Sequence, residues 1–268
     1  MLPVKIINDE LIYSDWKLLG IDYLVTGIIT KANNSLDINY EIYDVNKKRK
    51  VRSSKVFGIQ NQIRQLGHYT SDGIYESITG IKGIAATRIL YVNEIKDSQL
   101  TPTYRLMLAD SDGANEKILL SSSEPIISPS WSPDGKDIYY TSNQWGGPQI
   151  YKFNLESSEV SRVTFEGKYN LYPSLSYDGK LLLYLTQDQG KFKVALQNLQ
   201  SNQVLKLTKG PLDEAPVFAP NGHMVLFVYK DYGKTTKIGT VSINGLKIDH
   251  LPLGSRQVQE PAWGPIKN

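Results

Sequence analysis

The residues best suited to acid–base or metal chemistry are scattered along this chain. It has no cysteine, which removes thiolate nucleophiles, disulfides and cysteine-type zinc sites together. The three histidines, His68, His223 and His250, lie far apart in the sequence and show no metal-ligand spacing. His223 directly follows a turn and His250 ends a predicted outer strand, so we expect structural or solvent-exposed roles for them. The sequence therefore predicts no metal site and no cofactor.

The aspartates of three predicted Asp-Gly turns could be interpreted as calcium ligands. They are Asp112, Asp134 and Asp178. Calcium takes about six to eight oxygen ligands, whereas each of these turns supplies only one carboxylate. We therefore expect the three carboxylates to accept backbone hydrogen bonds within tight turns.

Sequence signatures of hydrolysis and of phosphate binding do not occur. The chain has no Gly-x-Ser-x-Gly elbow, and the repeats described below leave no room for an α/β-hydrolase domain. Glycine-rich phosphate-binding motifs do not occur either, and Gly146-Gly147 fits a hairpin better. We expect no catalytic residues, which leaves binding as the class of function.

Charge and hydropathy exclude further classes of protein. With 30 basic and 27 acidic residues, the net charge of +3 is too small for an electrostatically driven nucleic-acid binder. We expect the basic run at residues 47–50 to be solvated charge at a hairpin turn. The alternative is a patch that binds a polyanion or lipid headgroups. No segment has the roughly 18 apolar residues that span a bilayer, so we expect no direct membrane insertion. Residues 1–10 lack the basic start and apolar middle of a signal peptide.

An internal repeat organises the chain after about residue 88. Its marker is a proline followed two residues later by a large apolar side chain, and three of the four copies continue into an Asp-Gly or Asn-Gly pair. The marker prolines, Pro129, Pro173, Pro216 and Pro261, are spaced by 44, 43 and 45 residues. This is the length of one four-stranded β-propeller blade.

Each part of the repeat predicts a strand or a turn. The Asp-Gly or Asn-Gly pair supplies the positive φ of a tight turn, which joins a first strand near Trp131 to a second strand near Tyr139. Second strands such as residues 181–185 are almost continuously apolar, which indicates packing on both faces. A third strand, such as residues 149–153, and a short outer strand, such as residues 162–164, complete the unit.

The two ends of the repeat region complement each other. Residues 88–120 contain a second, a third and a fourth strand but no first one, and the last copy contains only a first strand. Pairing the strand near Trp263 with the strand near Ile89 would leave no open sheet edge. The sequence thus predicts a mostly β fold, with a four-bladed propeller over residues 86–268 that is closed by this pairing.

Residues 1–85 are typical of a small, partial α+β domain. Residues 22–29 and 38–45 indicate a hairpin, and residues 60–78 have helical spacing with apolar side chains on one side. Two or three strands and one helix make a modest core. We therefore expect this domain to depend on docking to the propeller or to be a piece of something larger.

Several segments resemble the TolB family, the periplasmic propeller proteins of the Tol-Pal cell-envelope system. Residues 66–72 and 78–83 are similar to that family's junction between its N-terminal domain and its propeller. The repeat at residues 131–135 and the closing residues 260–263 are similar as well. Compared with the family, about two blades, the export signal, the N-terminal arm and the opening strand and helix of the first domain are not found.

The resemblance implies a non-catalytic scaffold that binds the lipoprotein Pal at the propeller mouth and helps maintain outer-membrane integrity and cell division. It implies a periplasmic location and, without the N-terminal arm, argues against contact with TolA. We expect a monomer. Four short loops make a small interface, so binding should be weak. The loops that enter the first strands supply the binding candidates: Ile127, Ser128, Asn170, Leu171, Tyr172, Asp213, Glu214, Gln259 and Glu260.

Two other functions stay open at this point. Propellers of prolyl-oligopeptidase-like enzymes also carry Ser-Pro-Asp-Gly repeats, so the chain is alternatively an accessory domain of a hydrolase supplied by another chain. A shortened chain without retained binding is the other alternative. Pull-down of Pal would favour the scaffold, whereas esterase or peptidase activity in a complex would favour the accessory domain.

Overall fold

The computed structural model places most of the chain in two units. Contacts group Met1–Ile89 with Ala109–Glu116 in the first unit and Leu90–Leu108 with Lys117–Asn268 in the second. Unlike the division predicted at residue 85, this grouping assigns the turn around Asp112 to the first unit. Most of the segment 1–10, where the sequence predicts no signal peptide, lies outside the described residues. The described residues are 6–7, 10–96, 101–144, 146–230, 235–252 and 257–264.

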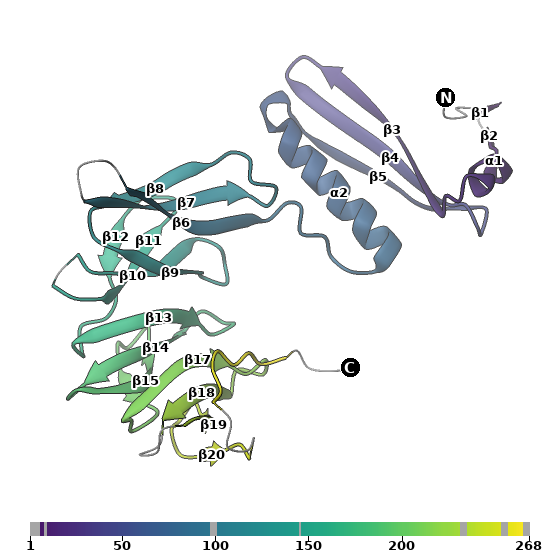
Figure 1. The fold of residues 1–268 in the computed structure, drawn as a ribbon. Coiled ribbons are helices and arrows are strands. Elements are labelled where there is room, and N and C mark those ends of the chain that lie inside the picture. The colour runs from purple at the N-terminus through teal and green to yellow at the C-terminus, as the bar shows by residue number, and fades with distance from the viewer. Residues whose placement is uncertain are drawn as a thin grey trace. The chain divides into compact units, whose positions relative to one another are not determined.

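The first unit is built on a three-stranded antiparallel sheet and a long helix, α2 (Figure 1). Strand β3 pairs with β4 along its whole length, and β4 pairs with β5. The predicted hairpin and helix are confirmed. Residues 45–48 form a turn, and the basic run starts in this turn and continues into β5. The elements are β1 (Ile6–Ile7), β2 (Glu10–Leu11), α1 (Tyr13–Leu18), β3 (Tyr23–Ala32), β4 (Ser35–Asp44), β5 (Arg49–Ile59), the 3-10 turn η1 (Gln60–Gln62) and α2 (Ile63–Thr79).

Helix α2 covers one face of this sheet (Figure 1). Alternate residues of β4 point to that face, and Leu36 and Ile38 pack against Leu66 of the helix. Tyr40 is buried on the same face, and a Cβ at Gly73 would collide with its hydroxyl group. Gly73 therefore allows the helix to approach the sheet closely.

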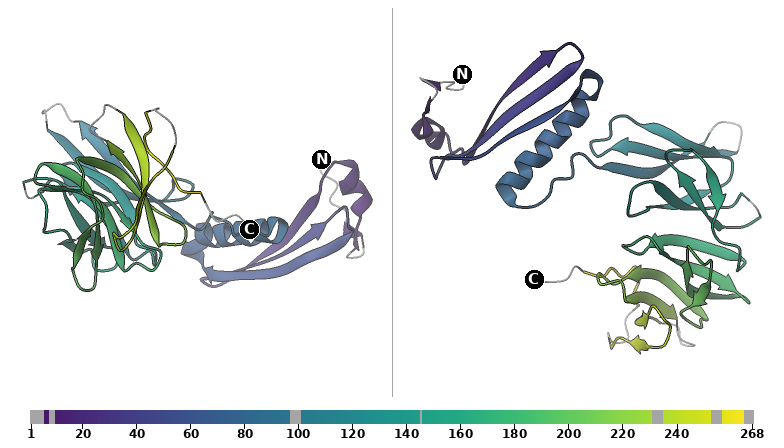
Figure 2. Two further views of the ribbon diagram at one scale, coloured as in Figure 1. Left: turned by 90° about the horizontal axis from the view of Figure 1, so that it is seen from below. Right: turned by 180° about the vertical axis from the view of Figure 1, so that it is seen from behind.

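The second unit repeats a four-stranded antiparallel arrangement (Figures 1 and 2). Its first sheet has three strands, and its last two repeats are joined by one parallel pair, Phe192 with Leu212. In chain order the strands are β6 (Arg88–Lys96), β7 (Pro102–Asp110) and β8 (Lys117–Ser122); β9 (Ile126–Trp131), β10 (Asp137–Ser142), β11 (Gln149–Asn154) and β12 (Val160–Arg162); β13 (Tyr169–Leu175), β14 (Leu181–Asp188), β15 (Lys191–Asn198) and β16 (Val204–Lys206); β17 (Leu212–Phe218), β18 (Met224–Lys230), β19 (Thr236–Ser242) and β20 (Ile248–His250).

The Asp-Gly turns between first and second strands form as the sequence predicts. Asp134 Oδ1 accepts the Ser132 hydroxyl at 2.6 Å and the Lys136 N–H at 3.1 Å. Asp178 accepts the equivalent two bonds at the same distances. These hydrogen bonds, the one from the serine first, hold the pKa of both carboxyl groups below its usual value. The structural role predicted for these two aspartates is confirmed.

Successive sheets pack through both faces of their second strands. Tyr140 of β10 clusters with Leu106 of the preceding sheet, whereas its neighbour Tyr139 clusters with Leu182 of the following sheet. The same alternation continues into the last sheet, where Leu183 clusters with Val225. The two-sided burial predicted for the second strands is therefore confirmed.

The predicted closure of the ring is wrong for this structure. The sheet of β6, β7 and β8 has no fourth strand, and residues 257–264 form no strand within the described part of the chain. Val258 is instead hydrogen-bonded to Thr236 at the start of β19. Local packing sets the angle between neighbouring sheets, so the end of the chain reaches the first sheet only if those angles add up to a full turn. The segment around Trp263 therefore does not pair with β6, although the mostly β organisation in repeated sheets is confirmed.

Candidate protein-binding rim

Four backbone positions in the repeats share a conformation that side chains rarely adopt. Ser128, Tyr172, Ala215 and Glu260 have φ angles of 53°, 58°, 50° and 48°. Each directly precedes the marker proline of its copy. Left-handed backbone is uncommon for residues other than glycine, and a following proline restricts the preceding residue further. Such strain persists only where the surrounding structure enforces it, so contacts around these four residues must hold them in place.

Each of the three paired first strands carries a bulge at the strained residue. The register with the second strand shifts between Leu171 and Ser174 in β13 and between Glu214 and Val217 in β17. Strand β9 has the same irregularity beside Ser128. A bulge bends its strand and changes the direction of the side chain within it. The sequence predicts loops at residues 125–128, 169–172 and 212–215, but the structure places nearly all of these residues in the first halves of β9, β13 and β17. We keep the name rim loops for these three stretches and for residues 257–260, and we call the four together the rim.

Each rim loop has, two positions before the strained residue, a residue that is buried or, in the last loop, half-buried. In the second loop this residue is Asn170, whose side chain is 0% exposed. Its backbone N–H donates to Pro148 O at 2.8 Å. Its side-chain amide donates to Gln149 Oε1 and to Glu166 O, both at 2.7 Å. These bonds tie the beginning of β13 to the neighbouring sheet.

Asp213 and Val258 occupy the equivalent positions in the next two copies. Asp213 is 4% exposed, and its Oδ2 accepts the Gly210 N–H at 2.8 Å. Burial raises the pKa of the Asp213 carboxyl. Val258 is half-buried and is fixed by the Thr236 hydroxyl. The position is Ile126 in the first loop, which is buried as well.

The structure divides the nine predicted binding residues into two groups. The side chains of Asn170 and Asp213 are covered, so they do not face a partner as the sequence predicts but hold their loops in place. A side chain without exposed surface offers no direct contact. The remaining seven are exposed or half-buried, with Ile127 40% and Tyr172 49% exposed. They are Ile127, Ser128, Leu171, Tyr172, Glu214, Gln259 and Glu260.

One open cavity of about 470 Å³ brings three of the four rim loops together. Tyr172 lines it from one loop, Glu214 from the next, and Gln259 and Glu260 from the last. Ile127 and Ser128 do not line it. Its other walls are apolar or small residues: Ala215, Pro216, Val217, Val228 and Pro261.

Sequence reasoning missed the apolar part of this cavity. Val228 lies on a second strand that is buried on both faces. The apolar sequence pattern of such a strand does not distinguish a residue that lines a cavity from one in the core. Ala215 could have been found, because it directly precedes a marker proline, as Tyr172 and Glu260 do.

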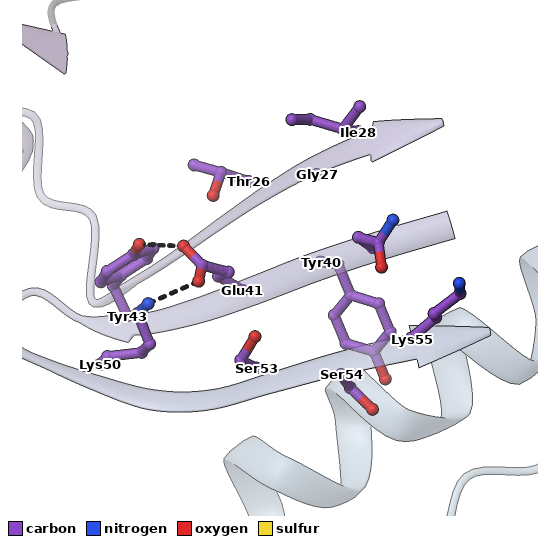
Figure 3. A pocket seen from close by; sticks show the side chains of 11 residues that line it. Thr26, Gly27, Ile28, Tyr40, Glu41, Tyr43, Lys50, Ser53, Ser54 and Lys55 are labelled. Atoms are coloured by element: carbon purple, nitrogen blue, oxygen red, sulfur yellow. Dashed lines mark hydrogen bonds and ion pairs between the residues drawn. The ribbon is translucent and has the colours of Figure 1, made fainter. Parts of the chain in front are cut away.

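A larger cavity, of about 740 Å³, lies over the sheet of the first unit (Figure 3). Its charged side chains already have partners. Lys50 Nζ lies 2.5 Å from Glu41 Oε1, and the Tyr43 hydroxyl also donates to Glu41. The bond from Lys50, followed by that from Tyr43, lowers the pKa of Glu41. Lys55 Nζ pairs with Asp37 Oδ2 at 2.7 Å. Because these charges neutralise one another, we place the candidate site at the rim.

The three histidines lie in separate places, as their spacing predicts. His68 Nε2 is 3.2 Å from Asp112 Oδ2, and the His250 ring centroid lies 4.5 Å from that of Tyr229. His223 is exposed after its turn. Among the described residues, no group of three or more His, Asp or Glu side chains is placed to hold a metal ion. In the same part of the chain, no helix combines the length and the apolar character needed to cross a membrane.

Two family models match this sequence. The model of the TolB amino-terminal domain matches residues 2–51. The model of the TolB beta propeller domain matches residues 75–140 and 127–267, which is more than half of the chain. The chain belongs to the TolB family. The predicted resemblance is therefore confirmed.

Curated relatives carry the name Tol-Pal system protein TolB. That of Pseudomonas fluorescens (strain Pf0-1) is 39% identical over 159 residues, which are 59% of this chain and 37% of the relative. That of Bordetella pertussis (strain Tohama I / ATCC BAA-589 / NCTC 13251) is 38% identical over 224 residues, which are 82% of this chain and 50% of the relative. The chain thus spans half or less of the length of these TolB proteins.

Solved structures confirm the propeller-like fold. A putative TolB from Agrobacterium tumefaciens has a TM-score of 0.52 at 17% identity, and the match covers 85% of this chain and 80% of that one. A puromycin hydrolase S511A mutant reaches 0.50 at 11% identity, covering 88% of this chain and 38% of that one. At these identities the likeness concerns the fold alone. The putative TolB and the puromycin hydrolase are thus both similar in fold to the repeated sheets described above.

Proposed function

We propose that this chain is a non-catalytic, periplasmic scaffold of the Tol-Pal system that binds the lipoprotein Pal at the rim. In this role it would support outer-membrane integrity and cell division. The observation that carries the proposal is the strained residue before proline, which recurs at four equivalent positions. Backbone strain of this kind costs about 1–3 kcal/mol per residue and clusters at functional sites. The family membership and the name of the curated relatives support the choice of system.

The rim has the composition of a protein contact surface. Exposed Tyr172 is of a residue type enriched at interfaces, and the cavity beside it combines apolar walls with a few polar groups. The rigid anchors Asn170 and Asp213 lower the conformational freedom that binding would otherwise remove from the loops. These features favour recognition of a folded partner. The likeness to a puromycin hydrolase concerns the fold alone and does not favour an accessory role in hydrolysis.

The expected affinity is low because the rim is small. An ordinary interface uses about 20–30 residues on each side, and the four rim loops supply fewer. We therefore expect a dissociation constant for Pal on the order of 10 µM or weaker. Mutational effects should be concentrated in the largest exposed side chain of the rim, Tyr172.

Calorimetric titration of the purified chain with the soluble part of Pal tests the proposal. Tyr172→Ala should weaken binding about tenfold or more, because truncating a central aromatic contact typically costs more than 1 kcal/mol. Tyr177→Ala is the matched control, since Tyr177 is 96% exposed and follows the other end of the same strand, β13. It should leave the affinity unchanged.

Two results would overturn this proposal. One is the absence of any heat of binding with Pal at concentrations up to about 1 mM. The other is an equal loss of affinity in Tyr172→Ala and Tyr177→Ala, which would place the interface away from the rim. Nanomolar binding would contradict the small interface expected from four loops.

A further inference from the structure

The rim cavity is lined by buried apolar residues, which we call its floor, and by two less buried glutamates, which we call its margin. Pro216 and Val228 are buried and form part of the floor, and Val217 is half-buried beside them. Glu214 is half-buried and Glu260 is exposed. Tyr172, which is 49% exposed as a residue, lines the cavity as well. A long side chain with an apolar stem and a polar end would contact both parts of such a cavity.

Neither carboxylate has a partner within the described part of the chain. Glu214 and Glu260 make no ion pair and no side-chain hydrogen bond there. In the cavity of the first unit, by contrast, Glu41 is neutralised by Lys50, and Asp188 on β14 is neutralised by Lys193 and Lys206. The rim cavity is therefore negative at its margin, unlike the cavity of Figure 3.

These properties favour one kind of occupant. An acidic side chain would be repelled by both glutamates, and a purely apolar one would leave the carboxylates without a counter-charge. A lysine or arginine side chain places methylene groups on an apolar floor while its charged end stays at the margin. The exposed face of Tyr172 adds a cation–π contact for the same charged group.

We propose that the cavity receives a lysine or arginine side chain of a partner protein. Its stem packs on Val217 and Val228, and its charge lies beside Glu214 and Glu260. This inference rests on the proposed function in that the rim is the partner-binding surface. It goes further by naming the anchor that the surface selects, so a partner segment without an exposed basic residue is rejected.

The test uses small probes that carry one side chain each. The ¹⁵N-labelled full chain is titrated with N-acetyl-lysine-N-methylamide and with the corresponding norleucine amide, which has the stem without the charge. We expect the lysine probe to shift the backbone amide signals of the lining residues that carry an N–H, with a dissociation constant on the order of 10 mM. They include Glu214, Ala215, Val217, Val228, Gln259 and Glu260. The norleucine probe should bind at least several-fold more weakly.

Variants locate the effect at the two carboxylates. The double substitution Glu214→Gln and Glu260→Gln should abolish the difference between the lysine and norleucine probes, because it removes charge while keeping the size of both side chains. Glu159→Gln, at an exposed position beyond β11, is the matched control and should keep the difference. The amide spectrum of each variant shows directly that it is folded.

The outcomes separate this inference from the proposed function. Equal binding of lysine and norleucine, or shifts confined to other residues, would overturn the basic anchor even if Pal binds. Selective lysine binding without any Pal binding would support the anchor and overturn Pal as the partner. If both bind, the double glutamine variant should also weaken Pal by about tenfold, and an unchanged Pal affinity would overturn the anchor.

Discussion

Thr236 holds the last repeat copy in place through two hydrogen bonds to Val258. Its hydroxyl donates to Val258 O at 2.6 Å and accepts the Val258 N–H at 2.9 Å. Asn170, the equivalent of Val258, is bonded to the corresponding place in the preceding repeat by different groups: its backbone N–H donates to Pro148 O and its side-chain amide to Gln149 Oε1. Gln149 and Thr236 both begin the third strand of their sheets. The C-terminal segment therefore docks on the last sheet as β13 docks on its predecessor, without forming a strand.

Thr236→Val removes both of these bonds while keeping the size of the side chain. We expect the free energy of unfolding, measured with urea, to fall by about 1–2 kcal/mol, and the Val258 amide to exchange faster. Thr240→Val is the control. Thr240 is buried on the same face of β19, and no side-chain hydrogen bond is found for it among the described residues. A similar loss in both variants would contradict the docking role of Thr236.

Two glycines of α2 differ in what surrounds them. A Cβ at Gly73 would collide with the hydroxyl of buried Tyr40, whereas a Cβ at Gly67 would meet nothing within 4 Å. We expect Gly73→Ala to lower the free energy of unfolding by about 1–3 kcal/mol through overpacking. Gly67→Ala should raise it by up to about 1 kcal/mol, because alanine favours helix. Thermal denaturation distinguishes them, and equal melting temperatures would mean that α2 does not pack closely on β4.

The parts of the fold that local signals encode could be predicted from the sequence. The glycine after Asp178 favours a tight turn independently of the rest of the fold. The apolar run at residues 181–185 likewise indicates a strand that is buried on both faces. Closure of the ring could not be predicted, because it depends on angles summed over all the sheets between β6 and Trp263. Each angle reflects side-chain packing that the spacing of prolines does not encode.

The rim was found only in part for a similar reason. The loops could be placed because they precede the marker prolines, but the left-handed residues are Ser128, Tyr172, Ala215 and Glu260, four types without a shared backbone preference. Burial of Asn170 and Asp213 was also hidden, since polar side chains in loops are usually exposed. Their burial arises from contacts with residues of the neighbouring repeat or loop.

Asp188 makes the stability of the third sheet sensitive to acid. Hydrogen bonds from Lys206, at 2.7 Å, and from Lys193, at 2.9 Å, lower the pKa of its carboxyl to about 2. This folded-state pKa lies below the usual value of about 3.9, so the stabilisation is complete above about pH 4 and is lost as the pH falls towards 2. Asp188→Asn should flatten the dependence of unfolding free energy on pH in that window.

Urea unfolding at several pH values between 2 and 5 measures this effect. Lys206→Met should produce an intermediate slope, because it removes the larger of the two contributions and leaves Lys193 in place. An Asp188→Asn variant with the slope of the original chain would show that the carboxylate titrates normally in the folded state.

Substitutions at Ala215 test whether the fold requires a left-handed backbone conformation at the rim residue before proline. Its φ of 50° is unfavourable for β-branched side chains, whereas asparagine adopts such angles more readily than most residues. Ala215→Val should therefore lower the free energy of unfolding by about 1–2 kcal/mol, and Ala215→Asn should change it by less than about 0.5 kcal/mol. Ala262→Val is the control, because Ala262 is exposed and is not among the positive-φ residues. If valine is tolerated equally at both positions, the bulge relaxes without cost and does not fix the loop tips.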